Sequence, residues 1–330
     1  MVRLRRVSAG MPGWLRVRHG RGFRYLDESR TALATVDLDR CKQLVIPPAW
    51  TDVWICPIEN GHLQAVGTDD AGRRQYLYHP DWRTRRDAEK FLHMELFARS
   101  LIRHRTTTRR DLGGEPDLVT VAAAAFSLLD LGMFRIGSDR YTDEHGSYGL
   151  TTIEKDHVTR NGRGITFSYT AKSEQEVEVT VRDDRVGAVL DTLLRRRGGG
   201  DRLLAYKDGR RWRDLVAEDV NDYVKDRLGE DFTAKDFRTW RGTVVAAHAL
   251  AASDASSKTA RKRSVAAAMR EVGDHLGNTA TVARGSYVDP RVVDLFNDGI
   301  TVAGGHRSIA PGAPASRTLE RQVLRLLKRA

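Results

Sequence analysis

The residue in this 330-residue sequence with the clearest chemical potential is Tyr287. It lies in the run Gly-Ser-Tyr-Val-Asp-Pro, residues 285–290, where small, polar and turn-forming neighbours give a tyrosine little reason to belong to a core. A tyrosine hydroxyl in such a setting can attack a phosphodiester and form a covalent intermediate. The alternative is a surface tyrosine in a loop, and this segment alone does not decide between the two.

Five other residues have types that could support attack on a phosphodiester. The reaction needs positive charge beside the non-bridging oxygens and a proton for the leaving alkoxide. Arginine also favours the phenolate form of a tyrosine, whose pKa is otherwise near 10. A lysine at the tip of a hairpin suits the general acid, because a cationic site lowers its pKa. The candidates are Arg135, Lys172, Lys235, Arg238 and Asn278.

Each candidate also has a purely structural explanation. Arg135 follows an apolar helical segment and could cap its carbonyl groups, and Lys172 could be a solvated lysine in a turn. Arg238 could pair with Asp236 or with a carboxylate far away in the sequence. Chemistry alone therefore leaves each assignment open.

The composition indicates a polyanionic partner. Lysine and arginine number 55 against 44 acidic residues, which gives a formal net charge of +11. This balance favours nucleic acid over a membrane surface as the partner. The apolar content of 40% is sufficient for hydrophobic cores, and the length predicts two domains.

Other composition signals concern the cellular compartment and cofactors. Cys41 and Cys56 are expected to be reduced core thiols, and no apolar run or leader indicates a membrane span or secretion. We therefore expect a cytoplasmic, nucleoid-associated protein. The sequence has neither a metal-ligand spacing nor a GxxxxGK[ST] motif, so we expect neither a metal ion nor ATP to take part.

The first 80 residues have the pattern of a small β-rich domain. Strands are expected at about 23–26, 53–58, 63–67 and 73–79, and a helix at about 38–45. In the last strand, alternation puts Gln75 and Leu77 on one face and Tyr76 and Tyr78 on the other. Aromatic side chains interleaved with Arg73 and Gln75 suit contact with a DNA groove and its phosphates, although edge packing explains the tyrosines equally well.

The middle of the chain is expected to position Arg135 and Lys172. A basic linker at about 80–88 precedes a cationic helix, and an alanine-rich helix at 118–134 ends next to Arg135. Three strands are expected at 149–153, 165–169 and 176–181. Lys172 would then lie at the tip of the hairpin between the last two.

From residue 183 onward the pattern is helical. Thr233 and Asp236 resemble a capping box at the start of a buried helix, which puts Arg238 in its first turn. A buried arginine there is costly without an anion, and a phosphate is the natural one. Another helix is expected at 264–276, followed by the Tyr287 segment, a linker from Gly304 to Ser316, and a short amphipathic helix that docks on the body.

In this order, the motifs resemble those of type IB DNA topoisomerases of the small poxvirus-like and bacterial kind. The resemblance covers nearly the whole chain. It rests on Pro-Pro-Ala-Trp at 47–50 with Val-Trp-Ile at 53–55, Asp-Asp-Ala-Gly-Arg-Arg-Gln-Tyr at 69–76, Arg-Ile-Gly at 135–137 with Tyr141, Lys-Asp-Phe-Arg-Thr at 235–239, and Gly-Asn-Thr at 277–279 followed by Tyr287.

The resemblance implies an α+β clamp of two domains: a β-rich DNA-binding domain over residues 1–85 and a mainly helical catalytic domain over residues 86–330 that carries a small antiparallel sheet. It implies that the enzyme relaxes positive and negative supercoils through a 3′-phosphotyrosyl link at Tyr287, religated by the 5′-hydroxyl. Arg135 and Arg238 would hold the phosphate, and Lys172 would protonate the leaving oxygen with help from Lys235. The same resemblance implies that Gln75, Tyr76 and Tyr141 contact double-stranded DNA, and that the enzyme is monomeric.

Two positions depart from the pattern of that family. Many members have histidine where this chain has Asn278, which can still donate a hydrogen bond to a phosphate oxygen but cannot carry charge. His275 is a weaker substitute, because it lies on the preceding helix. Lys172 follows an alanine where the family more often has a glycine.

Two other functions compete with this interpretation. A tyrosine recombinase has a similar set of residues, but usually with histidine at the position of Lys235 and with a helical N-terminal domain. A non-catalytic DNA clamp would use Tyr287 only for stacking or packing.

Overall fold

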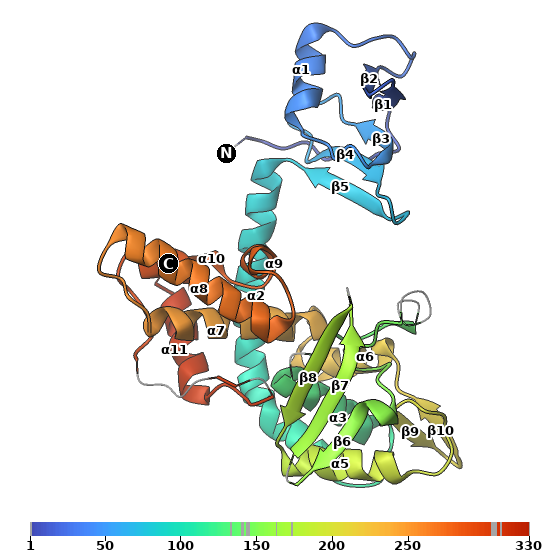
Figure 1. The fold of residues 1–330 in the computed structure, drawn as a ribbon, viewed down its shortest axis with the longest axis vertical. Helices are drawn as coiled ribbons and strands as arrows, with labels where there is room; N and C mark the ends of the chain where they lie inside the picture. Colours follow the sequence, from blue (N-terminus) through green and yellow to red (C-terminus); the bar gives the residue numbers. More distant parts are fainter. Residues whose placement is uncertain are drawn as a thin grey trace. The chain divides into compact units, whose positions relative to one another are not determined.

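The computed structural model describes residues 2–132, 134–139, 142, 146–162, 164–172, 174–304, 309–310 and 312–329. The chain divides into two compact units, Met1–Leu92 and His93–Ala330. The first contains an antiparallel sheet, and the second is mainly helical with two small sheets (Figure 1). The predicted α+β class, with a small β-rich unit and a larger helical one, is confirmed.

The first unit is organised by a five-stranded antiparallel sheet in the order β2-β1-β3-β4-β5. Trp54 belongs to one hydrophobic cluster with Cys56, whereas Val53 and Ile55 belong to a second with Cys41. This alternation along β3 means that both faces of the sheet are covered there, which explains why the strand is apolar and buried from Val53 to Ile55. The elements are β1 (Trp14–His19), β2 (Gly22–Leu26), α1 (Thr35–Gln43), β3 (Thr51–Ile55), β4 (Leu63–Thr68) and β5 (Arg74–Tyr78). Both cysteines are buried and free, as predicted.

A single helix, α2 (Pro80–Asp111), occupies the segment where a linker was predicted at about residues 80–88. That prediction is wrong. Pro80 stands at the start of the helix, where its missing N–H costs nothing, and neither glycine nor proline follows it before Asp111. The basic residues that suggested a linker are therefore residues of a helix.

The core of the second unit forms where α2, α3 and α7 meet. The ring of Phe237 on α7 lies 4.9 Å from that of Phe126 on α3 and 5.1 Å from that of Phe97 on α2, both edge to face. The helices of this unit after α2 are α3 (Leu118–Gly132), α5 (Asp184–Arg195), α6 (Ala217–Leu228), α7 (Ala234–Ala251), α8 (Lys258–Leu276), α9 (Ala280–Ser286), α10 (Pro290–Asn297) and α11 (Arg317–Leu327). Helix α7 also packs against α8 (Figure 1).

The larger sheet of the second unit has the order β6-β7-β8, with strands β6 (Val158–Asn161), β7 (Gly164–Ala171) and β8 (Gln175–Val181). The strand predicted at 149–153 is wrong, because the chain turns there: Ile153 N–H donates to the Gly149 carbonyl at 2.9 Å. A hairpin of β9 (Ala205–Asp208) and β10 (Arg211–Asp214) was missed. Its signal was Gly209 at the first position of the two-residue turn, with φ +60°.

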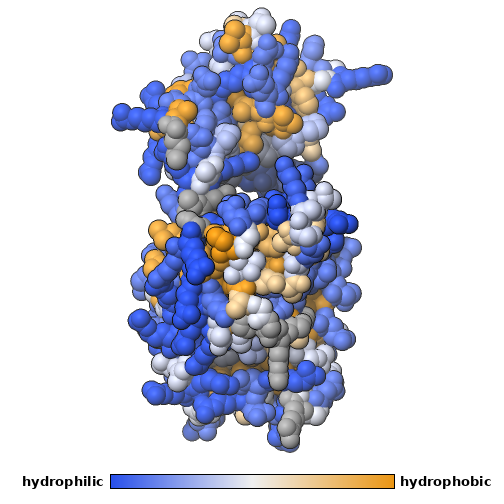
Figure 2. Space-filling model, turned by 90° about the vertical axis from the view of Figure 1, so that its left-hand side faces the viewer, coloured by the Kyte–Doolittle hydropathy of each residue, from blue (hydrophilic) through white to orange (hydrophobic). Residues whose placement is uncertain are grey.

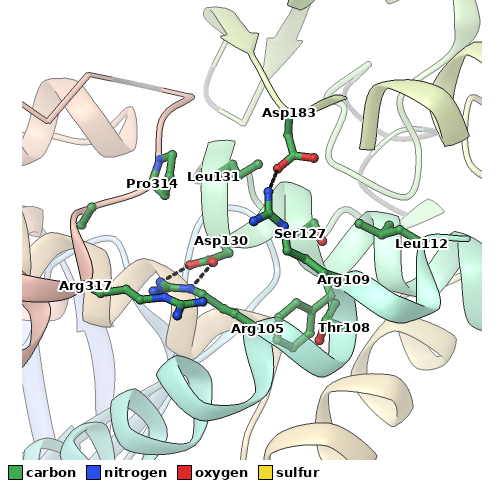
Figure 3. Close-up of a pocket in the computed structure, with 12 residues that line it drawn as sticks. Arg105, Thr108, Arg109, Leu112, Ser127, Asp130, Leu131, Asp183, Pro314 and Arg317 are labelled. Carbon is green, nitrogen blue, oxygen red and sulfur yellow. Dashed lines mark hydrogen bonds and ion pairs between the residues drawn. The ribbon is translucent and has the colours of Figure 1, made fainter. Parts of the chain in front are cut away.

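The C-terminal helix α11 docks on the body, as predicted. Glu320 is 1% exposed and accepts hydrogen bonds from Arg105 on α2 and Trp240 on α7, at 2.8 and 3.0 Å. Arg105 also binds Asp130 on α3, beside a small cavity of about 170 Å³ (Figure 3). These buried charges are paired, so the cavity belongs to the helix-docking network.

None of the described helices is long and apolar enough to cross a membrane. Hydrophilic residues cover most of the face shown in Figure 2, with smaller apolar areas between them.

Candidate active site

A cavity of about 650 Å³ in the second unit is lined by all six residues that the sequence singled out for chemistry. They come from the segment after α3, the β7–β8 turn, the N-terminal end of α7, the end of α8 and the end of α9. The structure thus brings together residues that are up to about 150 positions apart in sequence. They are Arg135, Lys172, Lys235, Arg238, Asn278 and Tyr287.

Tyr287 is the C-cap residue of α9 and is partly buried. Its backbone N–H donates to the Ala283 carbonyl at 3.0 Å, and its carbonyl accepts from the Thr243 hydroxyl on α7 at 3.4 Å. The same hydroxyl accepts from the backbone N–H of Asp289, which caps α10. The backbone around the tyrosine is therefore attached to α7 on both sides of Val288.

A glycine on α7 allows this close approach. A Cβ added at Gly242 would stand 2.7 Å from the Tyr287 carbonyl oxygen and 3.1 Å from the Tyr287 Cβ. Only glycine leaves room for the tyrosine backbone at this point of the helix. A glycine within a helical pattern was the only local signal of this contact.

Arg238 is 4% exposed and is the fifth residue of α7, immediately after the first turn in which it was predicted. The turn begins with the predicted capping box, in which the Asp236 carboxylate accepts from the Thr233 N–H at 2.8 Å. The Arg238 guanidinium carbon lies 5.1 Å from the centroid of the Tyr287 ring, and Nη2 donates to the Leu276 carbonyl at 2.7 Å. The arginine is thus held between the tyrosine and the end of α8.

Arg135 is held in place by the segment that was mistaken for a strand. Leu150 N–H donates to the Arg135 carbonyl at 2.8 Å, and a Cβ added at Gly149 would stand only 2.4 Å from the Cα of Gly137. Gly137 itself has φ +93°, a conformation that side chains rarely adopt. Two glycines therefore let the chain fold back tightly beside the arginine.

The C-terminal end of α8 holds both arginines and Asn278. Gly277 is its left-handed C-cap, with φ +57°. Arg135 Nη2 donates to the Gly277 carbonyl at 2.7 Å and to Asn278 Oδ1 at 3.2 Å, while Asn278 Nδ2 donates to the Leu276 carbonyl at 3.1 Å. The carbonyl end of a helix carries partial negative charge, so it suits these donors.

The two lysines enter the cavity from exposed positions. Lys172 lies in the turn between β7 and β8, where the sequence placed it. Lys235 is in the first turn of α7. Exposed ammonium groups at the rim of a cavity can reach a bound anion without a large desolvation cost.

Two tyrosines lie beside the same arginines, and their pKa values move in opposite directions. Burial raises the pKa of Tyr169 to about 12, against the charges of Arg135 and Arg238. Burial would also raise the pKa of Tyr287. There the charge and hydrogen bonding of Arg238, with the charges of Arg135 and Lys235, outweigh burial and lower the pKa below its usual value. Of the two, Tyr287 is therefore the phenol that ionises more readily.

The predicted DNA-contact residues that the structure describes lie in the first unit. Arg73 and Gln75 both donate to the Asp69 carboxylate, at 2.9 and 2.8 Å. Tyr76 is 49% exposed on the edge strand β5, and its ring stacks on that of Tyr78 with centroids 6.2 Å apart. Tyr141 lies outside the described residues. Contact of these side chains with DNA stays a prediction.

Family models match most of the chain. The model described as the catalytic core of eukaryotic DNA topoisomerase I matches residues 79–299, and the one described as the N-terminal domain of bacterial DNA topoisomerase IB matches residues 22–69. The chain is also 30% identical over 301 residues to a protein called DNA topoisomerase 1B from Acanthamoeba polyphaga mimivirus. The match covers 87% of this chain and 88% of that protein. The chain therefore belongs to the type IB DNA topoisomerases, a family of DNA isomerases.

Proposed function

We propose that this enzyme relaxes positive and negative supercoils by transient cleavage of one DNA strand, with Tyr287 as the nucleophile. The Tyr287 oxygen forms a bond to the phosphorus, and the bond from phosphorus to the 5′ oxygen breaks. Attack by the freed 5′-hydroxyl on the 3′-phosphotyrosyl link then reseals the strand. The observation that carries this proposal is the position of Arg238 over the Tyr287 ring in a cavity lined by all six candidates.

In this proposal Arg135 and Arg238 stabilise the negative charge that develops on the non-bridging oxygens. Both are already oriented by carbonyls at the end of α8, so little reorganisation is needed when the phosphate arrives. Asn278 orients Arg135 through its Oδ1, and its amide group has a second N–H that can reach a phosphate oxygen. The three residues act as one phosphate-binding corner.

Lys172 is the proposed general acid, and Lys235 assists it. The 5′ alkoxide is a poor leaving group and needs a proton as the bond breaks, which an ammonium group in a cationic pocket can supply. His275 is not a substitute for Asn278 in this proposal. Burial, followed by the charge of Arg241, lowers its pKa to about 4, so it is neutral at physiological pH.

We propose further that neither ATP nor a metal ion is needed. The energy of the phosphodiester is kept in the phosphotyrosyl link, and the arginines supply the positive charge that a metal ion supplies in other enzymes.

The β-rich unit, predicted to end near residue 85, would bind duplex DNA through Arg73, Gln75 and Tyr76. A single chain suffices for this chemistry, because the second unit carries all six candidate residues.

Relaxation of supercoiled plasmid in EDTA, without ATP, tests the proposal. We expect wild-type protein to relax positively and negatively supercoiled plasmid, and Tyr287→Phe to bind DNA without relaxing it. Equal relaxation by Tyr287→Phe would contradict the role of the tyrosine. A wild-type protein that forms a covalent adduct with DNA but does not relax the plasmid would favour a recombinase. A wild-type protein that binds DNA but neither forms an adduct nor relaxes the plasmid would favour a non-catalytic clamp.

A further inference from the structure

The turn that carries Lys172 has to be held in place if this lysine is to deliver a proton at a defined atom. Ala171, the last residue of β7, pairs with Gln175, the first residue of β8, and Lys172 lies in the turn between them. Lys172 is exposed, and Glu174 adopts the left-handed conformation with φ +54°. A long side chain on an exposed turn loses much conformational freedom when it is positioned. A contact at the base of the turn would reduce that loss.

Gln175, at the base of the turn, has an unusual environment. Its side-chain oxygen is buried, and the described part of the chain offers that atom no hydrogen-bond partner. Most buried polar atoms in proteins are hydrogen-bonded, so an exception of this kind calls for an explanation. The explanation most relevant here is a partner that arrives only when the site is occupied.

The oxygen of Gln175 lies against the end of α8. It is 3.1 Å from the point where a Cβ on Gly277 would stand, and Arg135 Nη1 is 3.8 Å from the same point. Because Gly277 has no side chain, the side-chain oxygen of Gln175 can occupy this position. This also brings a buried acceptor close to a guanidinium that presently donates, through Nη2, to the Gly277 carbonyl.

Gln175 also borders two cavities. It lines the cavity of about 650 Å³ together with Lys172 and Arg135. It also lines a second cavity of about 410 Å³ together with Arg135 and Tyr169. The side chain thus borders the same cavity as Lys172 and as the arginine that is proposed to bind the phosphate.

We propose that Gln175 is a positioning residue for the general acid. Its side chain packs on Gly277 and accepts a hydrogen bond from Arg135 when the guanidinium turns toward the scissile phosphate. This bond fixes the β7–β8 turn, and with it Lys172, at the moment of cleavage. The inference rests on the proposed roles of Lys172 and Arg135, and it adds a residue that couples them.

The test compares two DNA substrates that differ only in the leaving atom. In the first, the scissile bond joins phosphorus to the 5′ oxygen, which takes a proton from Lys172 as it leaves. In the second, a sulfur atom replaces that oxygen and leaves as a thiolate, which needs no proton. Single-turnover cleavage is measured for wild type, Gln175→Ala, Gln175→Met and Lys172→Ala, with DNA affinity and thermal unfolding measured alongside.

We expect both Gln175 variants to cleave the oxygen substrate about 10 to 100 times more slowly, as a small misplacement of a catalytic group does. On the sulfur substrate both should approach the wild-type rate, and their DNA affinity should not change. Methionine keeps the volume of glutamine without its acceptor, so it retains the packing if alanine impairs folding. Ser168→Ala, an exposed change on the neighbouring strand β7 that lines neither cavity, is the matched control and should behave as wild type.

Wild-type cleavage of the oxygen substrate by the folded Gln175→Met variant would overturn the inference. An equal loss on both substrates would also overturn it, because the defect would then not involve the general acid. A separate outcome concerns the proposed function. If sulfur does not rescue Lys172→Ala, then Lys172 is not the general acid, and the inference about Gln175 fails with it.

Discussion

The guanidinium of Arg238 lies over the ring of Tyr287, 5.1 Å from its centroid, while its Nη2 is held by the carbonyl of Leu276. This arrangement places a fixed positive charge beside the phenol before any substrate binds. A preorganised charge of this kind stabilises the phenolate without reorganisation at the time of reaction. The pairing is therefore the structural basis of the proposed nucleophile.

The pH dependence of cleavage should report this charge. Tyr287 attacks as the phenolate, so the rising limb of the single-turnover rate against pH should follow the pKa of Tyr287, which Arg238 lowers below the usual value near 10. In Arg238→Ala the charge is lost while burial remains, so the midpoint should move to higher pH. The pH–rate profiles of the two proteins test this. An unchanged midpoint in the variant would show that Arg238 does not control ionisation of the tyrosine.

Arg238→Ala should also lower the rate at every pH, by about 10²- to 10³-fold, because a donor to the developing charge is removed. DNA affinity should fall much less, since one arginine among 55 basic residues contributes little to non-covalent binding. Filter binding of the variant, compared with its cleavage rate, separates the two effects. A loss of affinity as large as the loss of rate would indicate a role in binding only.

The contact between Gly242 and Tyr287 gives a second prediction. In Gly242→Ala the new Cβ would stand 2.7 Å from the Tyr287 carbonyl oxygen, so the tyrosine backbone must move away from α7. We expect cleavage to fall about 10²-fold, as for other displacements of about 1 Å, with DNA affinity retained. Gly285→Ala is the matched control, because nothing lies within 4 Å of its new Cβ. Similar rates for the two variants would contradict the proposed role of this contact.

Asn278 offers a third prediction, from its two hydrogen bonds. Asn278→Asp would place a carboxylate facing the Leu276 carbonyl, and its charge would compete with the phosphate for Arg135. We therefore expect aspartate to slow cleavage more than alanine does, although aspartate has the shape of asparagine. Single-turnover cleavage rates of Asn278→Asp, Asn278→Ala and Asn278→His test this expectation. An aspartate variant faster than the alanine variant would show that orientation of Arg135 is not the main role.

His275 gives a prediction about stability. Burial and the charge of Arg241 lower its pKa from 6.5 to about 4 in the folded protein. The unfolded chain therefore binds more protons between these values, and this histidine costs stability as the pH falls from about 6.5 to about 4. His275→Gln should lose less stability than wild type over that range. Urea unfolding at several pH values measures the free energy of unfolding of both proteins. If this free energy depends on pH in the same way in both, the lowered pKa of His275 is contradicted.

Salt should weaken DNA binding strongly if phosphate contacts dominate. With roughly six to ten phosphates neutralised, the affinity should fall by about 10³ to 10⁵ between 50 and 200 mM salt. Titrations of Tyr287→Phe avoid interference from cleavage. A flat response would argue against binding through the basic surface.

Local signals in the sequence predicted much of the site. The capping box at Thr233 and Asp236 indicated the start of α7 and therefore the position of Arg238 near its N-terminus. Alternation and turn residues predicted β7 and β8, and with them the turn that carries Lys172. These features depend on neighbours within a few residues, so a single sequence contains them.

The remaining features depend on contacts between distant segments. The 149–153 segment has the apolar and β-branched residues of a strand, but its amides bond to the chain around Arg135. The contacts of Gly242 with Tyr287 and of Gln175 with Gly277 also join different elements. Periodicity within one segment does not indicate which segment it meets, so these contacts require the structure.

Tyr287 should become covalently attached to DNA during cleavage, and identification of the attached residue tests this most directly. The protein is mixed with labelled duplex DNA, denatured during the reaction and digested with trypsin, which should release Tyr287 in the peptide Gly285–Arg291. We expect a nucleotide attached to the oxygen of Tyr287 through a 3′ phosphate, and a 5′-hydroxyl on the other DNA fragment. An adduct on Ser286 or another residue, a link through a 5′ phosphate, or the absence of any adduct would contradict the claim.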